Sequence, residues 1–468
     1  MAAGGQITAE VVREFEELLG KRWVRSALRD RLTYSYDATA EKHLPGLVLF
    51  PGSAEEVAAA MRLAARYSLP VVPRGAGTNV SGGTIPTTGG VVMAMQRLNR
   101  ILSIDTVSRR AVVEPCVANL AVQEALAPHG LFFPPDPSSH KVSTIGGNCQ
   151  ENSGGPHCVK YGVAVNHIRG VELVLPDGEI VTVGGEAEGY PGLDLTALVV
   201  GSEGTLGIVT KVILNVIPLP EATSTILAVF DDLESCVRSV SEIIAARIVP
   251  AALELIDNPF INVIQDSMDA GLPRDAAGAL VIEVDGPPEG LGAQAEQIAA
   301  ICRRNGVRAV SVASDEAERN ALWQGRRAAY ACLARKSSFL WTMDITVPRG
   351  RLVEMMRRVL AVGERHGLEI YTVAHAGDGN LHPIIPFRPS DPAEKARVRA
   401  ADREILEACV DLGGSITGEH GIGVDKVEQT ALMFRPAELA LMNRVKLAFD
   451  PQGLMNPGKK IPLRTGGV

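Results

Sequence analysis

Hydrophobic and polar residues alternate in two different ways along this chain, and the change comes after Pro220. Before that point, short apolar runs are separated by turns rich in glycine, proline and threonine. Residues 46–73 hold an apolar run, a helix-like segment opened by the capping-box pair Ser53 and Glu56, and a second apolar run. We therefore predict one strand–helix–strand unit there and several short strands over residues 89–183.

After Pro220 the apolar runs are longer, and they alternate with segments that have the period of a helix. Strands are predicted at residues 224–230 and 279–286, and helices at residues 233–247 and 293–306. This order of elements favours an α+β fold with an antiparallel sheet and the helices on one face. The last predicted helix is followed by a stretch of proline and glycine.

The composition is that of a globular protein with more than one core. The chain has 468 residues, of which 46% are hydrophobic, and its net charge is -8. This acidic balance argues against nucleic-acid binding, which needs clustered lysine and arginine. No apolar run is long enough to predict a transmembrane segment, and the N-terminus lacks the pattern of a signal peptide. Seven cysteines without a CxxC pair favour reduced thiols. We therefore expect a cytoplasmic protein, for which a partner subunit would be the route to any association with a membrane.

A glycine-rich loop, RGAGTNVSGG, follows the second predicted strand at residues 74–83. It differs from the dinucleotide-binding fingerprint because Val80 stands where glycine or alanine is needed, and because no amphipathic helix follows. It also lacks the Gly-Lys-Ser/Thr ending of a nucleoside-triphosphatase loop. Two interpretations remain open at this point: a flexible turn, or a nest of backbone N–H groups that binds an anion beside Arg74.

Two further loops are rich in hydrogen-bond donors. One extends over residues 134–155 with the motifs PDPSS, STIGGN and NSGG, and the other has the sequence GSEGTLG at residues 201–207. Together with PRGAGTNVSGG, these motifs resemble the FAD domain of the vanillyl-alcohol-oxidase (p-cresol methylhydroxylase) superfamily. The resemblance covers nearly the whole chain and is strongest to the branch that contains the flavin-binding chain of glycolate oxidase and the FAD-dependent D-lactate dehydrogenases.

The resemblance implies an α+β fold with a two-part FAD-binding domain, an antiparallel (ferredoxin-like) cap and a C-terminal helical return. The expected domains are residues 1–220 for FAD, 221–430 for the substrate and a metal, and 431–468 for the returning helix and tail. Because the first loop has no histidine to tether flavin, we expect non-covalent FAD. The residues expected to bind it are Arg74, Gly75, Ala76, Gly77, Thr78, Asn79, Gly82, Asp136, Pro137, Ser138, Ser143, Thr144, Gly146, Gly147, Asn148, Asn152, Ser153, Gly154, Glu203, Gly207, Ile208, Val209 and Asn456.

Two histidines flank a Gly-Asp-Gly turn in the segment VAHAGDGNLHPII. If its arms form a hairpin centred between Asp378 and Gly379, His375 lies directly opposite His382, with the Cβ atoms ~4.5–5.5 Å apart. Two imidazoles in that position can bind one metal ion, because neutral imidazole is a common metal ligand. The alternative is a pair that is structural or merely exposed.

The motif GEHGIG supplies two further candidates. The resemblance implies that Glu419 joins the two histidines in holding a divalent metal (zinc, manganese or iron), and that His420 is the catalytic base. A turn or helix-cap histidine is the alternative for His420. For a substrate carboxylate the segment LWQGRRAAY offers Arg326 and Arg327, and the family's Trp-x-x-Arg pattern, counted from Trp323, selects Arg326. A solvated helix arginine is the alternative there.

The resemblance implies flavin-dependent oxidation of a small D-2-hydroxy acid to the 2-oxo acid, by hydride transfer to FAD at a site between flavin and cap. Glycolate and D-lactate fit better than 2-hydroxyglutarate, because Ile384 and Thr342 replace an asparagine and a lysine of the dehydrogenases for that dicarboxylate. The chain has no iron–sulfur motif, so electrons would pass to an external acceptor or a redox partner subunit of the iron–sulfur or electron-transfer-flavoprotein type. The alternatives are a 2-hydroxyglutarate-type dehydrogenase and a non-catalytic, flavin-binding subunit of a larger oxidase complex.

Overall fold

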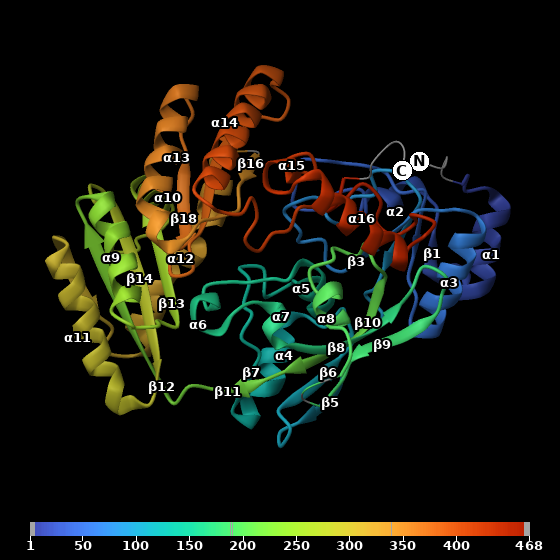
Figure 1. The fold of residues 1–468 in the computed structure, drawn as a ribbon, viewed down its shortest axis with the longest axis horizontal. Coiled ribbons are helices and arrows are strands. Elements are labelled where there is room, and N and C mark those ends of the chain that lie inside the picture. The colour runs from blue at the N-terminus through green and yellow to red at the C-terminus, as the bar shows by residue number, and fades with distance from the viewer. Residues whose placement is uncertain (1–4, 188, 190, 338, 463–468) are drawn as a thin grey trace. The chain divides into compact units, whose positions relative to one another are not determined.

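The computed structural model describes residues 5–187, 189, 191–337 and 339–462. The described residues form two compact units, and Figure 1 labels most of their elements. The first unit draws its residues from the ranges 1–154, 163–219 and 419–468, and the second from 155–162 and 220–418. This division differs from the expected domains at three places, the smallest of which is Pro220, which groups with the second unit. Residues 419–430 group with the first unit, and the short segment 155–162 groups with the second.

The smaller sheet of the first unit contains the strand–helix–strand unit that the sequence predicts. Strands β2 (Leu47–Leu49) and β3 (Val71–Arg74) both run parallel to β4 (Val91–Ala94), which lies between them, and β1 (Val24–Arg25) pairs antiparallel with β2. Helix α3 (Ala54–Arg66) connects β2 to β3. Ser53 Oγ accepts the N–H of Glu56 at 3.2 Å, and Glu56 Oε2 accepts that of Gly52 at 2.7 Å. Both residues of the predicted pair therefore cap this helix.

The larger sheet of the first unit is antiparallel and positions two of the predicted FAD loops. Its strand order is β5 (Ile101–Asp105), β6 (Arg110–Val113), β10 (Ile208–Asn215), β8 (Ile168–Val174) and β9 (Ile180–Gly184). Helices α4 (Asn119–Leu126) and α5 (Ile145–Glu151) share a hydrophobic core with it. The other elements of this unit are α1 (Ala9–Leu19), η1 (Lys21–Trp23), α2 (Leu28–Leu32), η2 (Ala127–His129), β7 (Leu131–Phe132), α7 (Ala164–His167), α8 (Leu195–Val199), β11 (Ile217–Pro218), α15 (Thr430–Met433) and α16 (Pro436–Phe449).

The second unit is built on one antiparallel sheet, as predicted. The order of its strands is β15 (Val307–Val312), β12 (Ala222–Phe230), β14 (Gly278–Gly286), β13 (Ala252–Asp257), β18 (Tyr371–His375), β19 (Asn380–Phe387) and β16 (Phe339–Thr342), and β17 (Ile345–Thr346) also pairs with β19. The helical elements are α6 (Cys158–Tyr161), α9 (Leu233–Ala245), α10 (Asn258–Ser267), α11 (Pro288–Arg304), α12 (Glu316–Ala334), η3 (Arg349–Arg351), α13 (Leu352–His366) and α14 (Pro392–Asp411).

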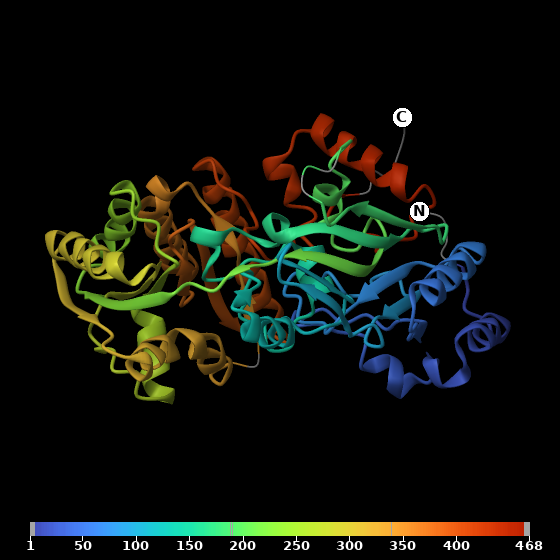
Figure 2. The same ribbon diagram turned by 90° about the horizontal axis from the view of Figure 1, so that it is seen from below.

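Helices cover both faces of this sheet, so the expectation of helices on one face is wrong. Helices α10 and α12 share a core with residues of one strand face, such as Ile256 and Val281. Gly278, on the opposite face of β14, instead lies against Leu233 and Cys236 of α9. Figure 2 shows helices on either side of these strands. The reason lies in β13 and β14, which are buried along nearly their whole length, as strands covered on both faces are.

All seven cysteines are free thiols, in agreement with the absence of a CxxC pair. No helix in the described ranges combines the length with the apolar character that crossing a bilayer demands.

Candidate functional site

The first glycine-rich loop, which follows β3 in the first unit, is held in shape by one asparagine. Asn79 Oδ1 accepts the backbone N–H groups of Ser81 at 2.9 Å and of Gly83 at 2.7 Å, a local turn that asparagine favours. Gly77 and Gly82 have positive φ angles of 73° and 79°, where a side chain would be strained. The loop therefore folds as a turn that is supported by its own side-chain hydrogen bonds and glycines.

The second predicted FAD segment lies directly against the first loop. Thr144 caps α5, with its Oγ1 accepting the N–H of Gly147 at 3.3 Å, and a Cβ on Gly75 would clash with that same Oγ1. Ser143 Oγ and Asn148 Nδ2 are buried and have no hydrogen-bond partner among the described residues. Buried polar atoms of this kind are costly unless a ligand or water satisfies them. The residues present therefore fit a polar cofactor such as FAD.

The third predicted FAD segment, residues 201–207, is linked to the first loop through the C-terminal tail. Asn456 donates from Nδ2 to the carbonyl oxygens of Gly83 at 2.9 Å and of Glu203 at 2.6 Å, and so connects two of the predicted FAD segments. The Glu203 carboxylate accepts the backbone N–H groups of Ile422 at 2.8 Å and Gly423 at 2.7 Å. The side chain of Glu203 thus holds the loop that carries the GEHGIG motif.

The remaining predicted FAD residues lie in the same loops or in the elements next to them. Asp136, Pro137 and Ser138 precede α5 in the loop after β7, and Gly146 and Gly147 lie in the first turn of α5. Asn152, with a φ angle of 55°, ends α5 and accepts the N–H of Val165 on its Oδ1 at 2.8 Å. The others are Ser153 and Gly154 after α5, Ala76 and Thr78 in the first loop, Gly207 before β10, and Ile208 and Val209 in β10.

A group of buried charges beside these loops was not anticipated from the sequence. Burial and the neighbouring Glu203 carboxylate raise the pKa of Glu151 well above its usual value. Burial also lowers the pKa of Lys459 to about 8. A Cβ on Gly421 would come within 2.6 Å of Glu151 Oε2 and 2.9 Å of Glu203 Oε1. The sequence carried one signal for this arrangement, the glycines on both sides of Glu419 and His420, which allow a close approach of backbone to side chains.

The histidine hairpin forms in the second unit, but its register differs from the prediction. His375 pairs with Asn380 and His382 pairs with Val373, so the two histidines are diagonal neighbours rather than directly opposed. The shift arises because residues 376–379 form the turn, which centres the hairpin one residue earlier in the chain. Diagonal neighbours still share a face of the sheet. The ring centroids of the two histidines are 5.1 Å apart, and each offers a nitrogen within 4.8 Å of one on the other.

Hydrogen bonds at Nδ1 orient both imidazoles. His375 Nδ1 lies 2.8 Å and 3.0 Å from the two carboxylate oxygens of Glu254, and His382 Nδ1 lies 3.3 Å from the carbonyl oxygen of Met343. Because both partners are acceptors, each Nδ1 carries the hydrogen and the lone pair of each neutral ring is on Nε2. Metal-binding histidines are commonly oriented in this way by a carboxylate or a carbonyl. The donor set of the pair therefore fits a divalent metal.

A second buried carboxylate, Asp344, anchors the segment that leads to Glu419. It accepts hydrogen bonds from Asn380 Nδ2 at 2.9 Å, Thr417 Oγ1 at 2.6 Å and the backbone N–H of Gly418 at 2.8 Å. At Glu419 the chain passes into the first unit. There Ser81 Oγ donates to the carbonyl oxygen of His420 at 3.0 Å, and Glu419 Oε1 lies 3.9 Å from His420 Nε2.

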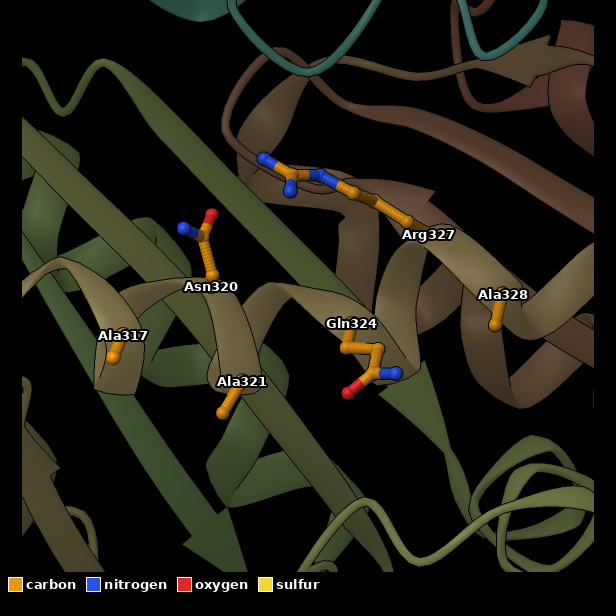
Figure 3. A pocket seen from close by; sticks show the side chains of 6 residues that line it. All are labelled: Ala317, Asn320, Ala321, Gln324, Arg327 and Ala328. Carbon is orange, nitrogen blue, oxygen red and sulfur yellow. The ribbon is translucent and has the colours of Figure 1, made fainter.

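The two candidate arginines of α12 have different surroundings. Arg326 has a side chain only 9% exposed, and its Nη2 lies 2.7 Å from Glu254 Oε2, so it is not a solvated helix residue. Burial alone would raise the pKa of Glu254, but its interactions with His375 and Arg326 outweigh burial and hold that pKa below its usual value. Arg327 instead lines an open hollow of about 570 Å³ on the outer side of α12 (Figure 3).

Comparison with known proteins identifies the family of this chain. Two family models match the chain: "FAD binding domain" over residues 45–184, and "FAD linked oxidases, C-terminal domain" over residues 219–460. Glycolate oxidase subunit GlcD of Bacillus subtilis is 42% identical over 455 residues, which are 97% of this chain and 97% of that protein. A D-lactate dehydrogenase of Archaeoglobus fulgidus is 32% identical over 419 residues, 89% of this chain and 91% of that protein.

Solved structures share the fold at low sequence identity. The structure of p-cresol methylhydroxylase with substrate bound has a TM-score of 0.81 at 16% identity and covers 96% of each chain. 4-Ethylphenol oxidase from Gulosibacter chungangensis has a TM-score of 0.80 at 22% identity, covering 97% of this chain and 98% of that one. Since one family model matches more than half of the chain and a relative 42% identical spans nearly all of it, the chain belongs to the FAD-linked oxidases and is an FAD-dependent oxidoreductase with the fold of the vanillyl-alcohol-oxidase superfamily.

Proposed function

We propose that this protein oxidises a small D-2-hydroxy acid, glycolate or D-lactate, to the corresponding 2-oxo acid, with FAD as the acceptor. The observation that carries the proposal is that His375 and His382 lie on one face of the second unit's sheet, with both imidazoles oriented by hydrogen bonds. The buried Arg326 contacts the carboxylate of Glu254, which His375 also contacts. The names of the relatives, glycolate oxidase subunit and D-lactate dehydrogenase, support the same class of substrate.

Two cofactors are part of the proposal. FAD would be held by the loops that include Asn79, Ser143, Asn148 and Glu203, and when bound it supplies a hydride acceptor. A divalent ion, zinc, manganese or iron, would be held by His375, His382 and Glu419, a nitrogen and oxygen donor set that suits these metals. The ion supplies Lewis-acid polarisation of the substrate hydroxyl.

The chain's own residues then have two tasks. His420 accepts the proton of the substrate hydroxyl, a role that suits imidazole near neutral pH. Arg326 binds the substrate carboxylate, for which a planar guanidinium is matched in geometry. Its Nη2 contacts Glu254, while its Nε is buried without a hydrogen-bond partner in the described part of the chain, which leaves a donor for the substrate.

The substrate is proposed to carry one carboxylate only. Ile384 and Thr342, the two positions that differ from the 2-hydroxyglutarate branch, are direct cross-strand partners in β19 and β16. Ile384 is 1% exposed, and Thr342 Oγ1 is buried with no hydrogen-bond partner among the described residues. Neither side chain offers a cation to a second carboxylate. This favours glycolate or D-lactate over D-2-hydroxyglutarate, which remains the alternative substrate.

A substrate screen tests this assignment. The purified protein is assayed with an artificial electron-accepting dye and with glycolate, D-lactate, L-lactate and D-2-hydroxyglutarate in turn. We expect the largest kcat/KM for glycolate or D-lactate. A larger value for D-2-hydroxyglutarate would move the chain to the dicarboxylate branch. Absence of dye reduction with every acid would favour a non-catalytic, flavin-binding subunit.

The FAD is expected to be non-covalent. No histidine lies in the first glycine-rich loop, residues 74–83, to form a tether. Precipitation of the protein with acid should therefore leave the yellow colour in the supernatant, measured by its absorbance. Flavin that stays with the washed precipitate would contradict this expectation.

Electrons taken from the substrate must leave the flavin again. We propose an external acceptor or a redox partner subunit, of the iron–sulfur or electron-transfer-flavoprotein type, as the recipient. The name "glycolate oxidase subunit" of the relatives supports a partner. Turnover by the isolated chain with a dye but not with oxygen alone would agree with a partner, and fast turnover with oxygen alone would argue against one.

A further inference from the structure

Glu254 stands out because it is an acid in the interior of an apolar strand. It belongs to β13, in which every residue is buried, and its own exposure is 0%. A carboxylate removed from water in this way is costly unless it is paired and hydrogen-bonded. Its partners include His375 and Arg326, which the proposed function assigns to the metal and to the substrate carboxylate.

The contact between Glu254 and His375 is set by the backbone. The two residues are register partners on the adjacent antiparallel strands β13 and β18. Directly opposed residues share a face, with Cβ atoms ~4.5–5.5 Å apart. The carboxylate receives the His375 Nδ1–H from the neighbouring strand, with both oxygens within 3.0 Å of that nitrogen. Strand pairing therefore fixes which nitrogen of His375 carries the hydrogen.

The contact between Glu254 and Arg326 comes from the helix above the sheet. Helix α12 packs on this face through Trp323 and Ala329, and its Arg326 Nη2 lies 2.7 Å from Glu254 Oε2. One oxygen of the Glu254 carboxylate thus contacts Arg326, and the same carboxylate also accepts the Nδ1–H of His375. The helix and the strand are tied together at this point.

We infer that Glu254 is a positioning residue that sets the tautomer of His375 and the orientation of Arg326 at the same time. It presents the Nε2 lone pair of His375 to the metal and holds the guanidinium at a fixed place relative to that imidazole. A substrate that bridges the metal and the arginine would then meet both at a constant separation. This inference rests on the proposed function for its metal and its substrate.

Glu254→Gln is the principal test variant. Glutamine keeps the size of the side chain but loses the charge, and its amide can donate to His375 Nδ1 as well as accept from it. The preference for one tautomer is therefore lost. Loss of a hydrogen-bond partner behind a metal ligand typically weakens metal binding by ~10–100-fold. We expect a loss of that size in Zn²⁺ affinity, a raised KM for D-lactate and unchanged FAD content.

Glu283 provides a matched control on the same face of the sheet. It is equally buried, at 1% exposure, and it binds Arg319 through both oxygens, at 2.9 Å and 3.0 Å, and Trp323 Nε1 at 2.9 Å. Glu283→Gln removes a comparable buried charge from this sheet without removing a partner of His375 or Arg326. We expect it to lower thermal stability while Zn²⁺ affinity and KM stay at the wild-type values.

Three measurements on wild type and variants decide the matter. They are calorimetric titration of the metal-free protein with Zn²⁺, the KM for D-lactate, and the ¹⁵N chemical shifts of the His375 imidazole. The wild type should show the Nδ1–H tautomer, and Glu254→Gln a mixture. Glu254→Asp, which keeps the charge on a shorter side chain, should retain the tautomer and recover part of the affinity. If Glu254→Gln does not fold, the same measurements on Glu254→Asp test the inference.

The inference would be overturned if both Glu254 variants kept the Zn²⁺ affinity, the KM and the His375 tautomer of the wild type. Equal losses in Glu254→Gln and Glu283→Gln would also overturn it, because they would indicate a general loss of packing. A wild type that binds no divalent ion and oxidises no hydroxy acid would instead refute the proposed function. The tautomer measurement needs neither metal nor turnover, so it decides the role of Glu254 separately.

Discussion

Replacing His420 by alanine is expected to leave FAD bound and to lower turnover of glycolate or D-lactate by at least ~10²-fold, the lower end of what general-base catalysis contributes. The change removes only the imidazole. Ser81 holds the carbonyl oxygen of His420, and Glu203 holds Ile422 and Gly423, so the backbone of this loop keeps its hydrogen bonds in the variant. Steady-state kcat and the flavin absorbance per protein are the measurements.

A matched control for this variant is His129→Ala, which removes an exposed histidine at the end of η2 in the same unit. It should keep both activity and FAD. Near-normal turnover in His420→Ala would remove His420 from the mechanism. Loss of flavin from His420→Ala would show that the residue supports the cofactor site instead.

Replacing His382 by alanine is expected to abolish tight metal binding and to lower turnover by ~10²–10³-fold. A Lewis acid contributes several kcal/mol to a reaction that develops negative charge on oxygen, and each ~1.4 kcal/mol is a factor of ten in rate. His382 is one of two oriented imidazoles, so its loss leaves an incomplete set of nitrogen ligands. Metal content by mass spectrometry and kcat with and without added Zn²⁺ or Mn²⁺ are the measurements.

His366→Ala is the control for this second variant. His366 ends α13 in the same unit and its Nε2 bonds Glu404 at 2.9 Å, away from the hairpin. It should leave metal content and turnover unchanged. Wild-type kcat in His382→Ala, or in wild type stripped of metal with a chelator, would exclude a metal from the reaction.

The parts of the fold that could be predicted from sequence are those set by local pattern. The β2–α3–β3 unit follows from apolar periodicity and from the cap at Ser53, and the antiparallel sheet of the second unit follows from its alternating elements. The order of elements does not show that helices cover both faces of that sheet, although four consecutive apolar residues, 279–282 in β14, indicate a strand buried on both sides.

The register of the histidine hairpin could not be derived in the same way. A strand pattern shows which residues share a face, and His375 and His382 do share one. The register also depends on how many residues the turn takes, which here are residues 376–379 with Gly379 at a φ angle of 91°. A Gly-Asp-Gly sequence fits turns of more than one length, so the centre of the hairpin remained undetermined.

Glu254 illustrates what the sequence does not display. It lies 72 residues before Arg326 and 121 before His375, and only the folded sheet and α12 bring the three together. The one signal in the sequence was a single acid inside the apolar run AALELI. An unpaired charge at such a position would be costly, so a partner could have been expected, but not which one.

In the proposed reaction, a small hydroxy acid delivers two electrons to FAD bound by this chain. This step is tested most directly by adding glycolate or D-lactate to the metal-loaded protein without oxygen and following the flavin spectrum. We expect the yellow colour to bleach and one equivalent of glyoxylate or pyruvate to form for each FAD reduced. A flavin that stays oxidised with both acids while divalent metal is present would contradict it.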